Sequence, residues 1–226
     1  MVSFVNSIAE NWAAIKEDLK GHAVTVVAVT KFQNLERIRE AVQCGITHFG
    51  NNYVQEGMAL RSALDTVEQV QWHFIGHIQS RKIKNLVDYD FIQSVDRVEL
   101  AAELSKRSAG LSKKPKVLIE VNIGNEASKS GVAPAALEKF LDSLDKLEGL
   151  SVDGLMAMPP PLEPVEERAR YFDEMRVWFD RLGAARRWST LSMGTSDDYR
   201  VAVRCGATMI RLGTVLLGAR PARNAE

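Results

Sequence analysis

The chain has 226 residues, of which 46% are hydrophobic and 26% are charged, a composition typical of a globular protein with a sizeable core. Lys and Arg together number 29, as do Asp and Glu, so the formal net charge is zero. This balance gives no electrostatic reason to expect a nucleic acid or an anionic membrane as a partner. We expect a single domain over residues 1–226.

The N-terminal segment carries Glu10, Glu17 and Asp18 among its apolar residues, so it predicts an amphipathic helix and not a signal peptide. No stretch elsewhere reaches the length of a transmembrane helix. Cys44 and Cys205 each precede a glycine at the end of a predicted helix, which is typical of small buried residues in a reducing compartment. We therefore expect a cytoplasmic protein.

The first predicted strand, residues 22–31, is a run of β-branched and small apolar residues that ends in Lys31, as a strand buried on both faces would. Asn34 can then cap a helix that stops at Gly45. The same strand and helix unit repeats along the chain. Further strands are predicted over 46–51, 71–78, 91–95, 117–123, 152–158, 191–194 and 209–214, and further helices over 53–67, 80–88, 97–108, 134–147, 163–182 and 197–204.

Eight strands that alternate with helices in a chain of this length predict an α/β fold, a (β/α)8 TIM barrel with an additional N-terminal helix. The alternative is a doubly wound open sheet, because closure of the strands is not visible in a sequence.

Polar residues at the carboxyl ends of barrel strands indicate where ligands bind. Lys31 ends the first predicted strand, and the segments 192–196 and 213–214 combine glycine with Ser or Thr, as anion-binding loops do. Arg211 points to one face of its strand and must find an acceptor there, either a carboxylate such as Glu120 or a ligand atom. These positions predict an anion site with a lysine and an arginine beside it.

A metal site is not expected. His73 and His77 have the spacing of a helical ligand pair, but four residues of strand span roughly 13 Å, which is too far for one ion. We therefore predict that His73 is a hydrogen-bonded core residue. The chain also lacks a Ser-His-Asp signature, a Walker loop and a GxGxxG turn.

Seven segments carry a resemblance to a known family. They are AVTK (28–31), HFGNNYVQEG (48–57), WHFIGHIQSRKIK (72–84), SKSG (128–131), GLMAM (154–158), LSMGTSDD (191–198) and IRLGTVLLGAR (210–220). In order and over nearly the whole chain, they resemble the pyridoxal phosphate homeostasis proteins, also called the YggS or proline synthase co-transcribed family. The resemblance implies a barrel similar to the N-terminal domain of alanine racemase.

The resemblance also implies a cofactor, pyridoxal 5′-phosphate (PLP, a form of vitamin B6), held as a Schiff base on Lys31. The implied cofactor-binding residues are Asn52, Ser192, Gly194, Gly213 and Thr214, with Arg211 at the pyridine nitrogen and with Lys129 and Met156 as secondary contacts.

An arginine at the ring nitrogen disfavours the pyridinium, so the cofactor would be a poorer electron sink than one paired with a carboxylate. The racemase also takes a tyrosine from a second domain, and this chain ends soon after its last predicted strand. We therefore expect a monomeric PLP carrier in cofactor homeostasis, with PLP-dependent apo-enzymes as recipients and without robust catalysis. The alternatives are a PLP-dependent amino-acid racemase of low activity and a phosphate-binding barrel isomerase without a covalent cofactor.

Two positions depart from the family pattern. Gln33 stands where many relatives have a second lysine, and Asn51 stands where most have Glu, which is expected to remove a charge near the cavity mouth.

Overall fold

The computed structural model describes residues 7–64, 69–111 and 114–219. Its strands pair in parallel, each with the next along the chain and the last with the first, to close a barrel. The strands are β1 Thr25–Val29, β2 His48–Asn51, β3 Gln71–Phe74, β4 Phe91–Val95, β5 Lys116–Val121, β6 Ser151–Ala157, β7 Thr190–Ser192 and β8 Met209–Leu212. The closed order confirms the predicted (β/α)8 barrel and excludes the open sheet.

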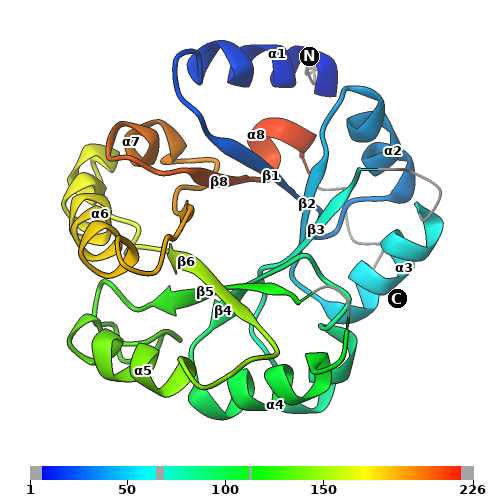
Figure 1. Ribbon diagram of the computed structural model, residues 1–226. Coiled ribbons are helices and arrows are strands. Elements are labelled where there is room, and N and C mark those ends of the chain that lie inside the picture. The colour runs from blue at the N-terminus through cyan, green and yellow to red at the C-terminus, as the bar shows by residue number, and fades with distance from the viewer. Residues whose placement is uncertain (1–6, 65–68, 112–113, 220–226) are drawn as a thin grey trace.

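Helices surround the strands on the outside of the barrel (Figure 1). They are α1 Ile8–Asp18, α2 Leu35–Gln43, α3 Val54–Ala63, α4 Val98–Ser108, α5 Leu137–Leu144, α6 Ala169–Gly183, α7 Tyr199–Arg204 and α8 Thr214–Leu217, with short 3-10 turns η1 Ser80–Asn85, η2 Pro134–Ala136 and η3 Val165–Arg168. Within the described ranges, no helix combines the length and the apolar character needed to cross a membrane.

The protein has two differently composed interiors. The core cluster is apolar and includes Ile38, Phe49 and Leu104, so ordinary hydrophobic burial drives its assembly. The inside of the barrel also holds buried polar side chains: Gln93 of β4 accepts a hydrogen bond from Ser192 of β7, and these two strands are not neighbours in the sheet. A barrel interior is usually filled by branched apolar side chains, so polar residues there indicate a function beyond packing.

Several element ends differ from the prediction. β1 ends at Val29, so Lys31 lies in the loop beyond it, and β3 ends at Phe74, four residues before the predicted end. The predicted helix 53–67 is α3, and residues 65–67 lie outside the described part. The short helix α8 was not predicted, because it follows β8 directly and lacks an apolar period of its own.

Candidate functional site

A cavity of 340 Å³ opens at the carboxyl ends of the strands. It is lined by Val29, Lys31, Asn52, Ile75, Met158, Thr195, Ser196, Asp197, Arg211, Gly213 and Thr214. The lining combines two cationic side chains, one carboxylate, three hydroxyl groups and one amide. This is the face on which barrels of this class carry their ligand sites.

Lys31 lies in a loop whose backbone is held by α3. Phe32, directly after it, has a φ of 62°, a conformation that residues other than glycine rarely adopt. The Phe32 N–H donates to Glu56 Oε1 at 3.0 Å, which fixes this turn. The Lys31 amine lies 5.1 Å from the Phe32 ring centre and 5.4 Å from that of Tyr53. The lysine is therefore presented to the cavity by a constrained loop.

The carboxyl group of Glu56 beside this loop has only one of its two oxygens hydrogen-bonded within the described residues. Its second oxygen, Oε2, is buried and finds no hydrogen-bond partner in the described ranges. Burial raises the pKa of the Glu56 carboxyl, while the hydrogen bond from Phe32 and the charge of Lys31 act in the opposite direction. Because Glu56 and Lys31 interact electrostatically, a change of charge on the lysine would be felt at this carboxyl.

Asn51 supports the loop from below. Its side chain is fully buried, and its Nδ2 donates to Thr30 Oγ1 at 2.7 Å. Asn51 does not line the cavity itself, although it adjoins Asn52, which does, so the expectation that this departure removes a charge near the mouth stays a prediction. Gln33 likewise lies outside the cavity lining.

Asn52 offers the cavity an unused acceptor. Its Oδ1 is buried without a hydrogen-bond partner among the described residues, although the residue lines the cavity. The adjoining backbone is tightly packed, since a Cβ at Gly76 would lie 2.0 Å from the Asn52 carbonyl oxygen. A buried polar atom without a partner costs about 1–3 kcal/mol, so a ligand that satisfied Oδ1 would recover that energy.

The loop after β7 and the start of α8 form one wall. The Gly213 N–H donates to Ser196 Oγ at 3.1 Å, which links the two segments. The Thr195 N–H donates to Asp198 Oδ1 at 2.6 Å, and Asp198 Oδ2 accepts from the guanidinium of Arg168 at 3.0 Å. Hydroxyl groups and the N–H groups that begin a helix are the donors that proteins use for phosphate.

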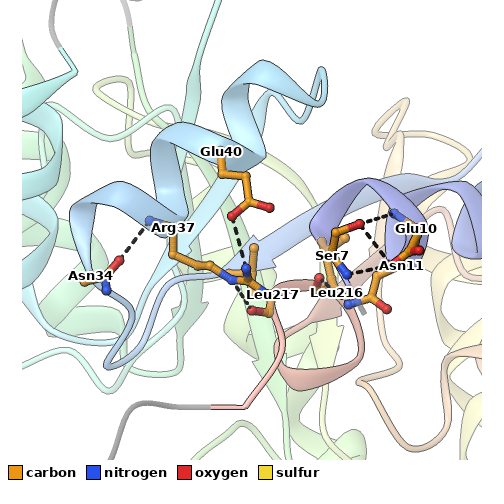
Figure 2. Close-up of polar contacts among 8 residues, drawn as sticks. All are labelled: Ser7, Glu10, Asn11, Asn34, Arg37, Glu40, Leu216 and Leu217. Atoms are coloured by element: carbon orange, nitrogen blue, oxygen red, sulfur yellow. Dashed lines mark hydrogen bonds and ion pairs between the residues drawn. The ribbon is translucent and has the colours of Figure 1, made fainter. Parts of the chain in front are cut away.

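Helix α8 is held from its other end, as Figure 2 shows. Asn11 of α1 donates to the Leu216 carbonyl at 3.1 Å, and Arg37 of α2 donates to the Leu217 carbonyl at 2.8 Å. The Arg37 guanidinium also pairs with Glu40 at 3.0 Å. The N-terminal helix therefore has a role at the site, because α1 and α2 together fix the element that begins at Gly213.

Replacing Arg37 with alanine is expected to lower the free energy of unfolding by about 1–2 kcal/mol, because the Leu217 carbonyl loses a charged donor. Amide hydrogen exchange in α8 should accelerate more than exchange in α2 itself. Urea denaturation and exchange measured by mass spectrometry check both effects. Arg39→Ala, an exposed arginine of the same helix, is the matched control. Equal exchange in the two variants would show that Arg37 does not hold α8.

Arg211 projects from β8 into the barrel and lines the floor of the cavity. It is 4% exposed, and its guanidinium donates to Ser192 Oγ at 2.6 Å and to the Ala157 carbonyl at 3.1 Å. Burial lowers the pKa of Arg211 to about 10, against the opposing charges of Glu120 and Asp198. Glu120 thus acts on Arg211 through its charge, and no hydrogen bond joins the two within the described residues.

The structure brings most of the predicted residues into this one cavity. Lys31, Asn52, Arg211, Gly213 and Thr214 all line it. They come from the ends of three strands, β1, β2 and β8, which the sequence orders but cannot place in space.

Four predicted residues lie elsewhere. Gly194 and Lys129 line a neighbouring cavity of 280 Å³, and Lys129 pairs with Glu126 at 2.5 Å. Met156 is buried and lines neither cavity. Ser192 is fully buried, with its hydroxyl bonded to Gln93 and Arg211, so it faces the barrel interior and not the cavity.

Six residues of the larger cavity's lining were not among the predicted contacts: Val29, Ile75, Met158, Thr195, Ser196 and Asp197. Met158, Thr195 and Asp197 line both cavities and so join them, and Ser196 lines the larger one. The signal for Thr195 and Ser196 was present, because both belong to the segment 192–196 that the sequence predicts to bind an anion. What the sequence did not show is where β7 ends.

Comparisons with known proteins agree with this geometry. The profile of the family described as alanine racemase, N-terminal domain, matches residues 5–221. A pyridoxal phosphate homeostasis protein of Pasteurella multocida is 36% identical over 228 residues, which cover 95% of this chain and 98% of that protein. The protein of the same name from Pseudomonas aeruginosa is 38% identical over 230 residues, covering 96% and 97%.

Solved structures give the same result. PipY of Synechococcus elongatus with PLP bound has a TM-score of 0.86 and 35% identity, and the match covers 93% of this chain and 100% of PipY. PipY without PLP has a TM-score of 0.88 at 36% identity, with the same coverage of both chains, 93% and 100%. An alanine racemase of Clostridium difficile has a TM-score of 0.74 at 16% identity, covering 97% of this chain and 58% of the racemase, which shows a common fold only.

Proposed function

We propose that this chain, which belongs to the pyridoxal phosphate homeostasis protein family and has the alanine racemase N-terminal domain fold, binds pyridoxal 5′-phosphate and holds it for release to other proteins. The observation that carries the proposal is the single cavity in which Lys31, Arg211 and the hydroxyl-lined wall at Ser196 and Thr214 face one another. Of the related proteins, PipY has been solved with PLP bound.

The residues fit the three chemical parts of this cofactor. When bound, the cofactor supplies an aldehyde that reacts reversibly with an amine and a ring that can delocalise negative charge. Lys31 would provide the amine, and Arg211 would donate to the ring nitrogen. The Ser196 and Thr214 hydroxyls and the first N–H groups of α8 would bind the phosphate, and Asn52 Oδ1 is left to accept from the ring substituents.

Ser196, and not Ser192, is therefore our proposed phosphate contact after β7. Ser196→Ala is expected to weaken the binding of inorganic phosphate about tenfold, because one neutral hydrogen bond to the anion is lost. Isothermal titration calorimetry measures the affinity, with Ser189→Ala as the control because its hydroxyl binds Asp153 outside the cavity. Unchanged phosphate affinity in Ser196→Ala would contradict this assignment and would mean that another donor of the loop binds the phosphate.

Two features support a carrier over an enzyme. A cation at the ring nitrogen keeps that nitrogen unprotonated, which weakens the ring as an electron sink. Racemisation also needs an acid or base on each face of the substrate carbon. Among the described residues that line the cavity, Lys31 and Asp197 are the groups that commonly fill such roles, and Asp197 is exposed.

We propose a monomer that passes the cofactor to PLP-dependent apo-enzymes.

The function is tested by loading and transfer. Protein saturated with PLP and passed through a desalting column should retain one cofactor per chain, and should restore activity to an added PLP-dependent apo-enzyme. Loss of the cofactor on the column would contradict the proposal. Time-dependent racemisation of alanine or serine, above a control with cofactor alone, would favour the racemase alternative instead.

A further inference from the structure

A chain of hydrogen bonds crosses the inside of the barrel, from His48 at the start of β2 to Arg211 at the cavity. Arg211 Nη1 lies 2.6 Å from Ser192 Oγ, which lies 2.7 Å from Gln93 Oε1. Gln93 Nε2 lies 2.9 Å from His73 Nδ1, and His73 Nε2 lies 2.9 Å from His48 Nδ1. The prediction that His73 is a hydrogen-bonded core residue is confirmed. The five residues come from five strands, so the chain spans the interior.

The hydrogen-bonded residues from Ser192 to His73 are shielded from solvent. Arg211 is 4% exposed, and Ser192, Gln93 and His73 are not exposed at all. A buried polar group that loses its partner costs about 1–3 kcal/mol, so breaking any one link is unfavourable. The residues are therefore expected to keep one arrangement.

The direction of the chain follows from Arg211, which can only donate. Ser192 Oγ accepts from Arg211, so its own proton goes to Gln93 Oε1. The amide nitrogen of Gln93 then faces His73 Nδ1 and donates to it. His73 must therefore be neutral with its proton on Nε2, from which it donates to His48 Nδ1. Each link points away from the cavity.

The surroundings of the histidines agree with this direction. Burial lowers the pKa of His73 well below its ordinary value, and His48 adds to the effect. Burial also lowers the pKa of His48, against the opposing charge of Asp90. His73 stacks on Phe91 with ring centres 4.5 Å apart, which fixes the plane of its ring. The shifts in pKa therefore favour the neutral form of both imidazoles.

We propose that Ser192, Gln93 and His73 are positioning residues for Arg211, acting as a one-directional hydrogen-bonded chain that sets where the guanidinium meets a ligand in the cavity. Ser192 Oγ accepts one N–H group of Arg211 at Nη1, and the Ala157 carbonyl accepts one at Nη2. The remaining N–H groups are left for the ligand. The inference rests on the proposed function for the identity of that ligand, whereas the chain itself can be tested without it.

The first experiment uses the wild-type protein without any cofactor. Two-bond correlations between the ring nitrogens and carbon-bound protons in nitrogen-15 NMR spectra distinguish the two neutral histidine tautomers. We expect His73 to carry its proton on Nε2 and to leave Nδ1 unprotonated. A proton on Nδ1, or a doubly protonated ring at neutral pH, would overturn the proposed direction. This outcome does not depend on whether the protein binds pyridoxal phosphate.

The second experiment changes single links. Gln93→Glu keeps the shape of the side chain but replaces the donor by an acceptor, so the proton of His73 should move to Nδ1. Ser192→Ala removes the acceptor for Arg211 and should weaken pyridoxal phosphate binding about tenfold. Both variants should also shift the absorbance maximum of the bound cofactor. Inorganic phosphate affinity should fall less, because phosphate does not need the ring-nitrogen donor.

The matched control is Ser105→Ala, which removes a buried hydroxyl that accepts from the Gly149 N–H at 2.9 Å in α4, outside the barrel interior. It should lower stability without changing cofactor affinity or absorbance. If Ser192→Ala and Gln93→Glu behave like this control, the three residues are structural only and the proposal is wrong. If wild-type protein binds no pyridoxal phosphate but shows the expected His73 tautomer, the proposed function fails while the direction of the chain stands.

Discussion

Replacing Asp198 with alanine is expected to lower the free energy of unfolding by up to about 3–5 kcal/mol, because the buried Arg168 guanidinium loses its buried partner and keeps only the exposed Glu163 carboxylate. The side chains of Arg168 and Asp198 are only 7% and 5% exposed, and their charged atoms are 3.0 Å apart. Asp198 also accepts from the backbone N–H and the hydroxyl of Thr195. The variant should therefore lose phosphate binding together with stability, because the wall of the cavity is released.

Urea denaturation and phosphate calorimetry measure the two effects. Asp197→Ala is the matched control, since this neighbouring carboxylate is exposed and should change stability by less than about 0.5 kcal/mol. Asp198→Asn keeps the acceptor for Thr195 but removes the charge, so it should lose stability and retain more phosphate affinity than alanine. A small loss of stability in Asp198→Ala would show that the ion pair with Glu163 is enough to stabilise the Arg168 guanidinium.

The second large effect is a pH dependence at Glu120. Burial, with the nearby charge of Asp96, raises the pKa of Glu120 from its ordinary value of 4.5 to about 7, although Arg211 opposes the shift. Because the folded state holds this proton more tightly, the unfolded chain ionises first as the pH rises. The stability that the proton provides is complete below pH 4.5 and is lost as the pH rises through about 7.

Glu120→Gln removes this pH dependence. We expect the free energy of unfolding of the variant, relative to wild type, to increase by up to about 3 kcal/mol between acid and pH 8. Denaturation curves at several pH values check the prediction, and the difference between the two proteins should be largest above pH 7. Parallel stability profiles would mean that the pKa of Glu120 is the same in the folded and the unfolded chain, which would contradict the prediction.

Much of the site could be predicted from the sequence because it follows from the alternation of strand and helix. Arg211 was placed inside the barrel by its position on β8, and the structure puts it there with its guanidinium buried. Lys31 was expected at the carboxyl end of β1, and it lies in the loop immediately beyond. These placements need only the period of a strand and the rule that ligands bind at strand ends.

What could not be predicted depends on where each strand stops. β7 ends at Ser192, so that side chain still points into the barrel, while Ser196 in the loop reaches the cavity. The hydrogen-bonded chain from His48 to Arg211 could not be predicted either. Its two ends are 163 positions apart in sequence, and only closure of the barrel brings each member into contact with the next. Helix α8 is fixed by α1 and α2 and not by a pattern of its own.

The measurement that tests the central claim most directly is the absorbance spectrum of the protein with added pyridoxal phosphate, before and after borohydride reduction, for wild type and Lys31→Ala. We expect a yellow absorbance band in the wild type. Reduction should then attach the cofactor permanently to Lys31, as peptide mass mapping would show. The Lys31→Ala variant should show neither the band nor the attached cofactor. A wild type without this band, or a reduced label on another lysine, would contradict the assignment of this cavity as the cofactor site.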